Sequence, residues 1–334
     1  MRERFLVLDS LRGLAALSVL IFHLHSISWF SRVHAYLSVD FFFLLSGFVL
    51  AHAYEARMRE PGAIAGFLRE RVIRLHPLLI LSILPAAILL LLNPIGRDPL
   101  PALTAIAAAI PFPAIWKLGL PFLIFPLNLP SWSLFWELVV NIIFAVLAPR
   151  LGTRTLVAIV TVTGAALAVA TFNGVSDGRM AIAGLRALAL FPLGVLLLRM
   201  HRANRWRLGR FGSFAVPLFL AVILVPGPFD QVRDLLARFV IFPAILLAAA
   251  GHGARFPAIY AFLGGMSYPL YVLHMPVTIL LGMGFVAAGY PVSDLLNAAL
   301  SLPIIWLIWR FYDEPVRAWL RRRVGWRRPR EPIG

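Results

Sequence analysis

Long apolar runs recur along the whole chain, and they decide what it can fold into. A helix needs roughly 20 mostly apolar residues to cross the hydrocarbon core of a bilayer, and ten segments meet that requirement. Lipid offers no partner to a free backbone N–H or C=O, so such segments cross as helices. We therefore predict an all-α, polytopic integral membrane protein. The predicted spans are residues 6–28, 36–54, 75–93, 130–149, 154–172, 181–199, 211–227, 234–250, 257–287 and 294–312.

Composition leaves no room for a soluble domain beside these spans. Hydrophobic residues make up 60% of the chain and charged residues 14%, whereas soluble domains have about 45–50% and about 25%. We predict a transmembrane domain over residues 1–316 and a basic cytoplasmic tail over 317–334. Residues 100–127 are apolar but rich in proline, and we expect a re-entrant or surface segment there, with an extra pair of spans as the alternative.

The distribution of basic residues predicts the orientation. With the N-terminus inside, the cytoplasmic loops and tails carry 23 of the 31 basic residues and the outside loops carry five. The positive-inside rule therefore places both termini in the cytoplasm. The net charge of +16 could also indicate a nucleic-acid partner. Because the charge lies in short loops between apolar runs, topology explains it better, and we expect no nucleic acid. Three basic residues fall within spans: Arg12, Arg186 and Arg238.

The first span carries ionisable side chains, which are costly at membrane depth and by default suggest a function. Arg12 and His23 are 11 residues apart. They share one face about 16 Å apart along the axis, with Arg12 near the cytoplasmic surface and His23 near mid-membrane. Asp9 lies one turn before Arg12 and can pair with it. The alternative for His23 is a structural histidine that bonds to a neighbouring helix.

Asp40 opens the second span beside a run of Phe and Leu, so its carboxylate needs a partner. His23 and Arg12 on the preceding helix are the candidates. A carboxylate bonded to an imidazole fixes the tautomer and makes the ring a better base. The alternative is an interfacial helix cap.

Arg71 and Arg74 lie one turn apart at the end of the predicted inside loop 55–74. Paired guanidiniums suit phosphate, because each can form two charge-assisted hydrogen bonds. The alternative is ordinary positive-inside charge.

Two polar stripes follow later helices at helical spacing. They are Ser133, Glu137 and Asn141 in span 130–149, and Ser267, Tyr271 and His274 in span 257–287. Buried polar groups in membranes point inward, where they form a site or join helices. The histidines are too scattered to predict a metal site. Cysteine is absent, which excludes disulfides and a thioester on the enzyme.

Six sequence pieces, in this order, resemble the acyltransferase-3 family of bacterial membrane O-acyltransferases. They are LDSLRGLAALSVLIFH (8–23), SVDFFFLLSGF (38–48), RVIRLHP (71–77), SWSLFWE (131–137), GGMSYPLYVLH (264–274) and DEP (313–315). The chain departs from the family at Phe135 and Trp136, where the family commonly has a second serine-containing step. It also lacks the hydrolase-like domain of some relatives, so it resembles the stand-alone form.

The resemblance implies a multi-pass enzyme of the bacterial inner membrane with no permanently bound cofactor. It implies transfer of an acyl group, usually acetyl, from cytoplasmic acyl-CoA to a hydroxyl of a glycan or glycolipid. Arg71 and Arg74, with Arg12, would hold CoA, and His23 would be the base. The further site candidates are Asp40 and Glu137 as catalytic carboxylates, and Asp9, Ser133, Tyr271 and His274.

Other interpretations stay open at this point. An acyl-histidine intermediate is an alternative to direct transfer. A transporter or flippase would use the same intramembrane charges, although we find no inverted repeat of the kind that transporters often show.

Overall fold

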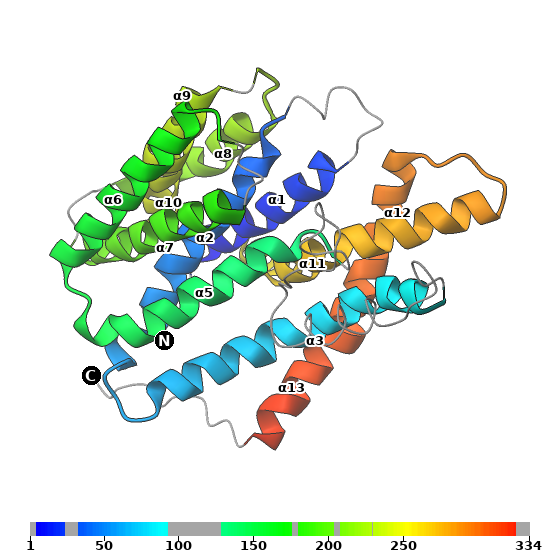
Figure 1. Cartoon of the computed structure of the whole chain (residues 1–334), viewed down its shortest axis with the longest axis horizontal. Coiled ribbons are helices and arrows are strands. Elements are labelled where there is room, and N and C mark those ends of the chain that lie inside the picture. Colours follow the sequence, from blue (N-terminus) through cyan, green and yellow to red (C-terminus); the bar gives the residue numbers. More distant parts are fainter. Residues whose placement is uncertain are drawn as a thin grey trace.

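Helices form wherever the sequence has a long apolar run, in the part of the chain that the structure describes. The computed structural model describes residues 5–23, 33–92, 128–175, 180–203, 208–228 and 230–324. These residues contain helices and turns and no strand, which confirms the all-α prediction for them (Figure 1). The predicted re-entrant segment 100–127 lies outside the described residues.

The main helices follow one another along the chain. They are α1 (Leu6–Phe22), α2 (Ser38–Tyr54), α3 (Ala63–Leu92), α5 (Ser131–Leu147), α6 (Thr153–Phe172), α7 (Met180–Arg202), α8 (Ala215–Leu224), α9 (Gln231–Leu236), α10 (Phe242–Ala250), α11 (Pro257–Ala287), α12 (Asp294–Ile308) and α13 (Glu314–Arg323). The 3-10 turns are η2 (Ala35–Leu37), η3 (Glu55–Arg57), η5 (Ala148–Arg150) and η6 (Leu208–Phe214), and the π-helical turns are η7 (Ala237–Ile241) and η8 (Trp309–Asp313).

Seven helical stretches of the described chain are long and apolar enough to cross a membrane. They are Ala35–Arg57, Ala63–Leu89, Ser131–Arg150, Thr153–Phe172, Met180–Arg202, Pro257–Ala287 and Asp294–Arg323. The helix α1 has 17 residues, and the predicted spans 211–227 and 234–250 are a short helix and a helix interrupted by η7. The protein is therefore a polytopic membrane protein, while ten spans and cytoplasmic termini stay predictions.

Two helix boundaries differ from the sequence prediction. The helix α3 begins at Ala63, well before the expected residue 75, so Arg71 and Arg74 lie inside a helix and not in a loop. Pro77 and Pro85 sit within α3, which membrane helices tolerate because neighbouring groups can satisfy the freed carbonyls. The first helix ends at Phe22 and not at 28, so His23 is its C-cap residue.

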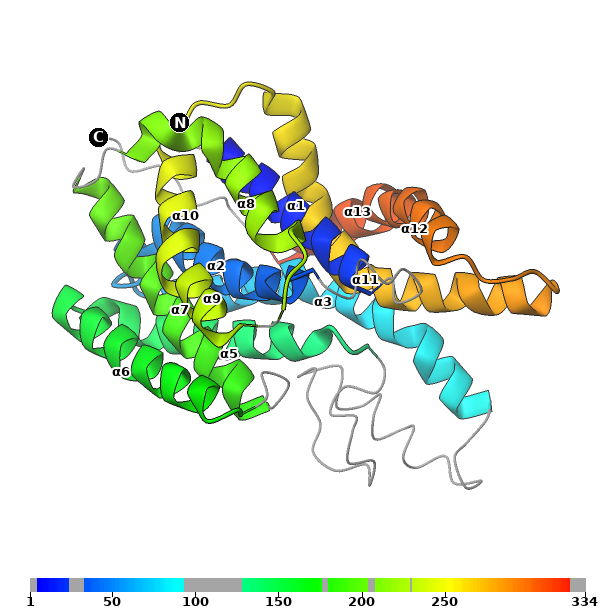
Figure 2. The same ribbon diagram turned by 90° about the horizontal axis from the view of Figure 1, so that it is seen from above.

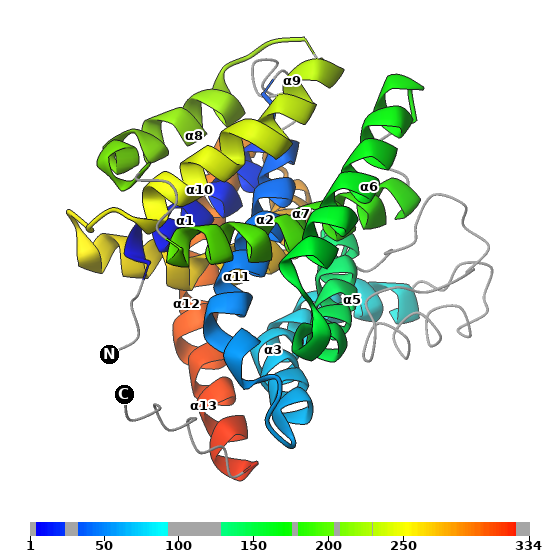
Figure 3. The ribbon, with the colours of Figure 1, turned by 90° about the vertical axis from the view of Figure 1, so that its left-hand side faces the viewer.

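Close helix crossings at glycine organise the core. A Cβ atom on Gly47 would lie 2.0 Å from the carbonyl oxygen of Phe191, and one on Gly194 would lie 2.0 Å from that of Leu44. These glycines let α2 and α7 touch backbone to backbone, as small residues do in membrane bundles (Figure 3). Gly13 does the same for α1 against Leu263 of α11 (Figure 2).

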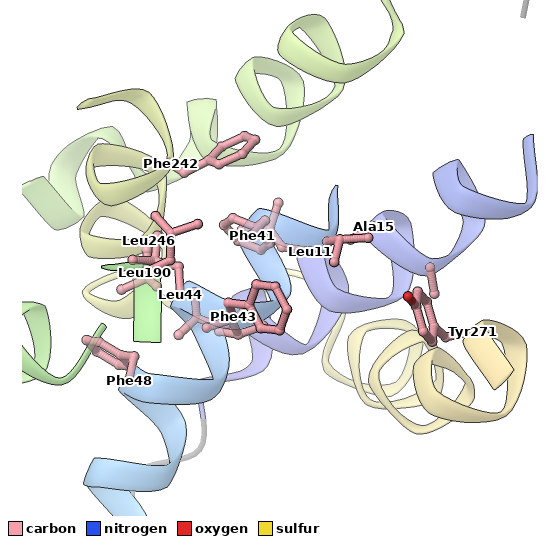
Figure 4. Packing of buried hydrophobic residues seen from close by; sticks show 14 of the residues in the cluster. Leu11, Ala15, Phe41, Phe43, Leu44, Phe48, Leu190, Phe242, Leu246 and Tyr271 are labelled. Carbon is pink, nitrogen blue, oxygen red and sulfur yellow. The ribbon is translucent and has the colours of Figure 1, made fainter. Parts of the chain in front are cut away.

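Aromatic and aliphatic side chains fill the space around these crossings. The buried residues include Leu11, Ala15, Phe41, Leu44, Phe48, Leu190, Phe242 and Leu246, which come from α1, α2, α7 and α10 (Figure 4). The helix α2 contributes Phe41, Phe43 and Phe48 to this view and packs against α1, α7 and α10. It therefore holds the polar residues at its start in a fixed position.

One end of the bundle, here named the basic end, gathers the start of α1 and the last turns of α2 and α7. The Phe5 ring lies 4.9 Å from the His52 ring and 5.8 Å from the His201 ring. Arg199 pairs with Glu55 at 2.6 Å. At the opposite end, the backbone N–H of His34 donates to the carbonyl of Ile223 at 2.8 Å.

Candidate active site

A cavity lies between α1, α2, α3, α5 and α11. Its wall brings together residues that are far apart in the sequence. Six of the ten predicted site residues line it: Arg12, Arg71, Arg74, Ser133, Glu137 and Tyr271. Apolar side chains of α2, among them Phe42, Leu45 and Val49, form much of the remaining wall.

Arg71 and Arg74 place two guanidiniums on this cavity. Arg71 is 5% exposed and lies over the Phe67 ring at 5.7 Å. Neither arginine forms an ion pair with a carboxylate of the described residues; the adjacent Glu70 pairs with Arg321 instead. The Nε of Arg71 is buried and has no hydrogen-bond partner among those residues. A buried charge without a partner is costly, so the arrangement suits a bound anion.

Arg12 is held in a fixed position on the same cavity. Its Nη2 donates to Asp9 Oδ1 at 2.9 Å and to the Gly264 carbonyl at 2.8 Å, so the Asp9–Arg12 pair expected from the sequence is present. Its Nε donates to Ser267 at 2.9 Å. A Cβ atom on Gly264 would lie 2.6 Å from the Cβ of Asp9. Glycine is therefore needed where α11 meets this ion pair.

A pair of hydroxyls and a carboxylate also line this cavity. Ser133 Oγ and Tyr271 Oη are 2.6 Å apart, and Tyr271 is 6% exposed. Glu137 accepts a hydrogen bond from Ser46 at 3.2 Å. The Phe42 ring packs edge-on against Tyr271, with centroids 5.4 Å apart. Ser133 and Tyr271, one from each predicted stripe, thus meet inside the bundle.

His23 and His274 form a pair, with ring centroids 5.0 Å apart. Their Nδ1 atoms lie 2.8 Å from the carbonyls of Val19 and Tyr271 respectively. A carbonyl only accepts, so each Nδ1 carries the proton when the ring is neutral and each Nε2 is the basic atom. The Nε2 of His274 is buried and has no hydrogen-bond partner among the described residues.

The histidine pair adjoins the cavity without being part of its described lining. The rings of Tyr271 and His274 are 6.2 Å apart on the same face of α11. Tyr271 therefore connects the cavity wall to the histidine pair. The sequence singled out both histidines but not their contact, which depends on how α1 crosses α11.

Asp40 lies deep in the bundle between two arginines. Its Oδ1 accepts from Arg186 Nε at 2.7 Å, and its Oδ2 accepts from Arg238 Nε at 2.9 Å. Asp40 and Arg238 are 0% exposed and Arg186 is 3% exposed. The sequence suggested His23 or Arg12 as the partner, and the structure shows these two arginines instead. The sequence contained a signal for this pairing, because two arginines within membrane spans require an anionic partner.

The arginine partners come from helices far along the chain. Arg186 lies in the second turn of α7, with its guanidinium over the Trp132 ring at 5.6 Å. Arg238 belongs to the π-helical turn η7. A π-helical turn inserts an extra residue into the helix and is frequent at functional sites. Among the described residues, no group of three or more His, Asp or Glu side chains comes together as a metal site would.

The fold and the cavity define a class: a polytopic helical membrane protein with an arginine-lined pocket beside a histidine pair. The acyltransferase domain family matches residues 5–310 of the chain. The chain therefore belongs to the acyltransferase-3 family, which confirms the resemblance. This membership favours an enzyme over the transporter or flippase.

A curated relative covers part of the chain. Protein 2 in the picA locus of Rhizobium radiobacter is 39% identical over 184 residues, which are 50% of this chain and 95% of that protein. No solved structure matches the chain.

Proposed function

We propose that this protein transfers an acyl group, with acetyl as the expected one, from cytoplasmic acyl-CoA to a hydroxyl of a cell-envelope or exported glycan or glycolipid. The bacterial inner membrane is the expected location. Family membership supports acyl transfer. The observation that carries the donor assignment is the pair of guanidiniums, Arg71 and Arg74, which face the cavity without a carboxylate partner among the described residues.

The acyl donor would enter the cavity from the basic end of the bundle. Phosphates of CoA would pair with Arg71 and Arg74, because guanidiniums bind phosphate through two parallel hydrogen bonds. The pantetheine arm would follow the apolar wall at Leu45 and Val49. The thioester carbonyl would then lie near the Ser133–Tyr271 hydroxyl pair.

The chemistry would follow from the histidine pair beside the cavity and from the hydroxyl groups in its wall. The Nε2 of His23 would take the proton from the acceptor hydroxyl, and the oxygen would attack the thioester carbonyl carbon. Hydroxyl donors aimed at the developing oxyanion would lower the barrier, and Ser133 and Tyr271 are the candidates. Collapse of the tetrahedral intermediate breaks the C–S bond and releases the CoA thiolate, which takes the proton back from His23 as the ester forms.

The remaining site candidates comprise a second acid–base group and three residues that would act through others. Glu137 is the second acid–base candidate, because its carboxylate lies in the cavity wall. Asp9 would orient Arg12 through their ion pair. Asp40 would act as a positioning residue through Arg186 and Arg238. His274 would support His23 through their ring contact.

The test uses inverted membrane vesicles that contain the protein and its native acceptors. Radiolabelled acetyl-CoA is added to the exposed cytoplasmic face, and base-labile radiolabel in the membrane fraction is measured as ester. We expect His23→Gln to lower this signal by about 10²–10⁴-fold, the usual contribution of a general base. His201→Gln, which removes a histidine that packs on Phe5 at the basic end, should retain it. Full transfer by His23→Gln would contradict the assignment.

A further inference from the structure

A second cavity lies on another face of α1. Its lining residues come from the first half of α1, from η6 and α8, from the turn between α10 and α11, and from the first turns of α11. None of its described lining residues belongs to the donor cavity. The proposed transfer reaction leaves this space without a role.

Glycine contacts build the wall of this second cavity. A Cβ atom on Gly209 would lie 2.4 Å from the carbonyl oxygen of Gly251, and one on Gly212 would lie 2.2 Å from the Cβ of His252. The segment η6 and the α10–α11 turn therefore meet backbone to backbone. Their contact places His252, which bonds the Gly209 carbonyl through Nδ1 at 3.2 Å, beside the cavity.

The polar part of the lining is basic. Arg255 is exposed, lies over the Phe256 ring at 5.2 Å, and forms no ion pair with a carboxylate of the described residues. Ser10, Ser213 and Tyr260 add hydroxyl groups to the wall. No acidic side chain is found among the described lining residues. The charge is therefore suited to an anion.

The rest of the lining is apolar. A free anion would make no use of apolar walls, whereas a ligand with an apolar part would. Leu14, Val216 and Leu263 form this part. Phe256 and Phe214 beside it are 49% and 63% exposed. Exposed aromatic rings next to arginine are typical of the membrane–water interface. Basic pockets between membrane helices on the cytoplasmic side bind anionic lipid head groups.

We propose that this second cavity binds an anionic phospholipid. The phosphate lies at Arg255, within reach of the hydroxyls of Ser213 and Tyr260, and an acyl chain follows the wall of Leu14 and Leu263. The bound lipid supports the face of α1 that points away from the donor cavity. A ligand that binds only the folded state raises its stability by mass action, so occupancy is measurable without any acyl transfer.

The test is lipid binding by the purified full-length protein in an uncharged detergent. Phosphatidylglycerol or phosphatidylcholine is added in equal amounts. The bound lipid is counted by native mass spectrometry, and the melting temperature of each sample is measured as well. We expect wild type to retain phosphatidylglycerol and to gain melting temperature from it, with little response to phosphatidylcholine. Arg255→Ala should bind phosphatidylglycerol about tenfold more weakly, which corresponds to the loss of one charge-assisted contact of about 1.4 kcal/mol.

Two further variants make the result specific to this cavity. Arg210→Ala is the matched control, because Arg210 lies over Phe211 and is not among the described lining residues; it should bind like wild type. Gly253→Trp should block binding, because a Cβ atom there meets nothing within 4 Å and the ring can enter the cavity.

Three outcomes would overturn the proposal. They are equal binding of both lipids, unchanged phosphatidylglycerol binding by Arg255→Ala and Gly253→Trp, and an equal gain in melting temperature from inorganic phosphate alone. The last would indicate a free-anion site. None of these outcomes bears on acyl transfer, so the two proposals fail separately.

Discussion

The carboxylate of Asp40 compensates the charge of two arginines inside this bundle. It accepts hydrogen bonds from Arg186 and Arg238, and all three side chains are almost fully buried. Removal of one partner from a buried ion pair leaves an uncompensated charge and costs about 3–5 kcal/mol. Asp40→Asn should therefore destabilise the protein by about this amount, measured as a loss of unfolding free energy in denaturant.

The Asp9–Arg12 pair offers a matched comparison for that prediction. Its side chains are 19% and 22% exposed, and ion pairs in contact with water contribute little, with a typical range of about 0–1 kcal/mol. Asp9→Asn should therefore cost much less than Asp40→Asn. Equal losses for the two variants would show that the buried triad is not the stabilising feature described here.

At the scale of elements, the turn η2 just before α2 is held against α8 and α9 by polar contacts. The Nε2 of His34 accepts from Arg233 Nη1 at 2.6 Å, and Tyr36 donates to Asp234 at 2.7 Å. Burial, together with the charge of Arg233, lowers the pKa of His34 below its ordinary value. The imidazole is therefore neutral at pH 7 and accepts the hydrogen bond.

This contact predicts how stability depends on pH. The folded state binds a proton at His34 less readily than the unfolded state, whose pKa is about 6.5. Stability is therefore full above that value and falls as the pH drops below it. We expect the melting temperature of wild type to fall more between pH 7.5 and 5.5 than that of His34→Gln. An identical decrease in both proteins would assign the acid sensitivity to other groups.

The sequence predicted contacts within a helix better than contacts between helices. Asp9 and Arg12 are one turn apart, so their pairing follows from helical periodicity alone. Asp40 pairs with residues on α7 and η7, and periodicity says nothing about which helices become neighbours. His23 meets His274 because Gly13 and Gly264 let α1 and α11 approach closely. The early start of α3 was missed because its first turns carry charge, which resembles a loop.

At the scale of the whole molecule, the fold predicts that two of its turns lie on opposite sides of the membrane. The turn between α2 and α3 lies at the basic end. The helix α11 leads away from that end, and the turn between α11 and α12 lies at its far end (Figure 1). The chain has no cysteine, so a single introduced thiol can be labelled without background. Glu60 and Tyr290 are exposed residues of these two turns.

Thiol labelling in intact cells tests the predicted orientation. With the basic end in the cytoplasm, as the positive-inside rule requires, Glu60→Cys should be protected from a membrane-impermeant maleimide and Tyr290→Cys should react. Permeabilised cells, in which both variants should react, provide the control. The reverse pattern would place the arginine cavity on the outside and would remove cytoplasmic CoA as its ligand.

Calorimetry of acyl-CoA binding to the purified protein tests most directly whether the arginine-lined cavity holds the acyl donor. Arg71→Ala/Arg74→Ala removes both guanidiniums that line the cavity, and each contact between charged groups contributes about 1.5–3 kcal/mol. We predict that this variant binds acetyl-CoA at least about 100-fold more weakly than wild type. Arg59→Ala/Arg69→Ala removes two exposed arginines of the same region that are not among the described lining residues, and it should bind like wild type. Equal affinity in all three proteins would contradict the assignment of this cavity to the acyl donor.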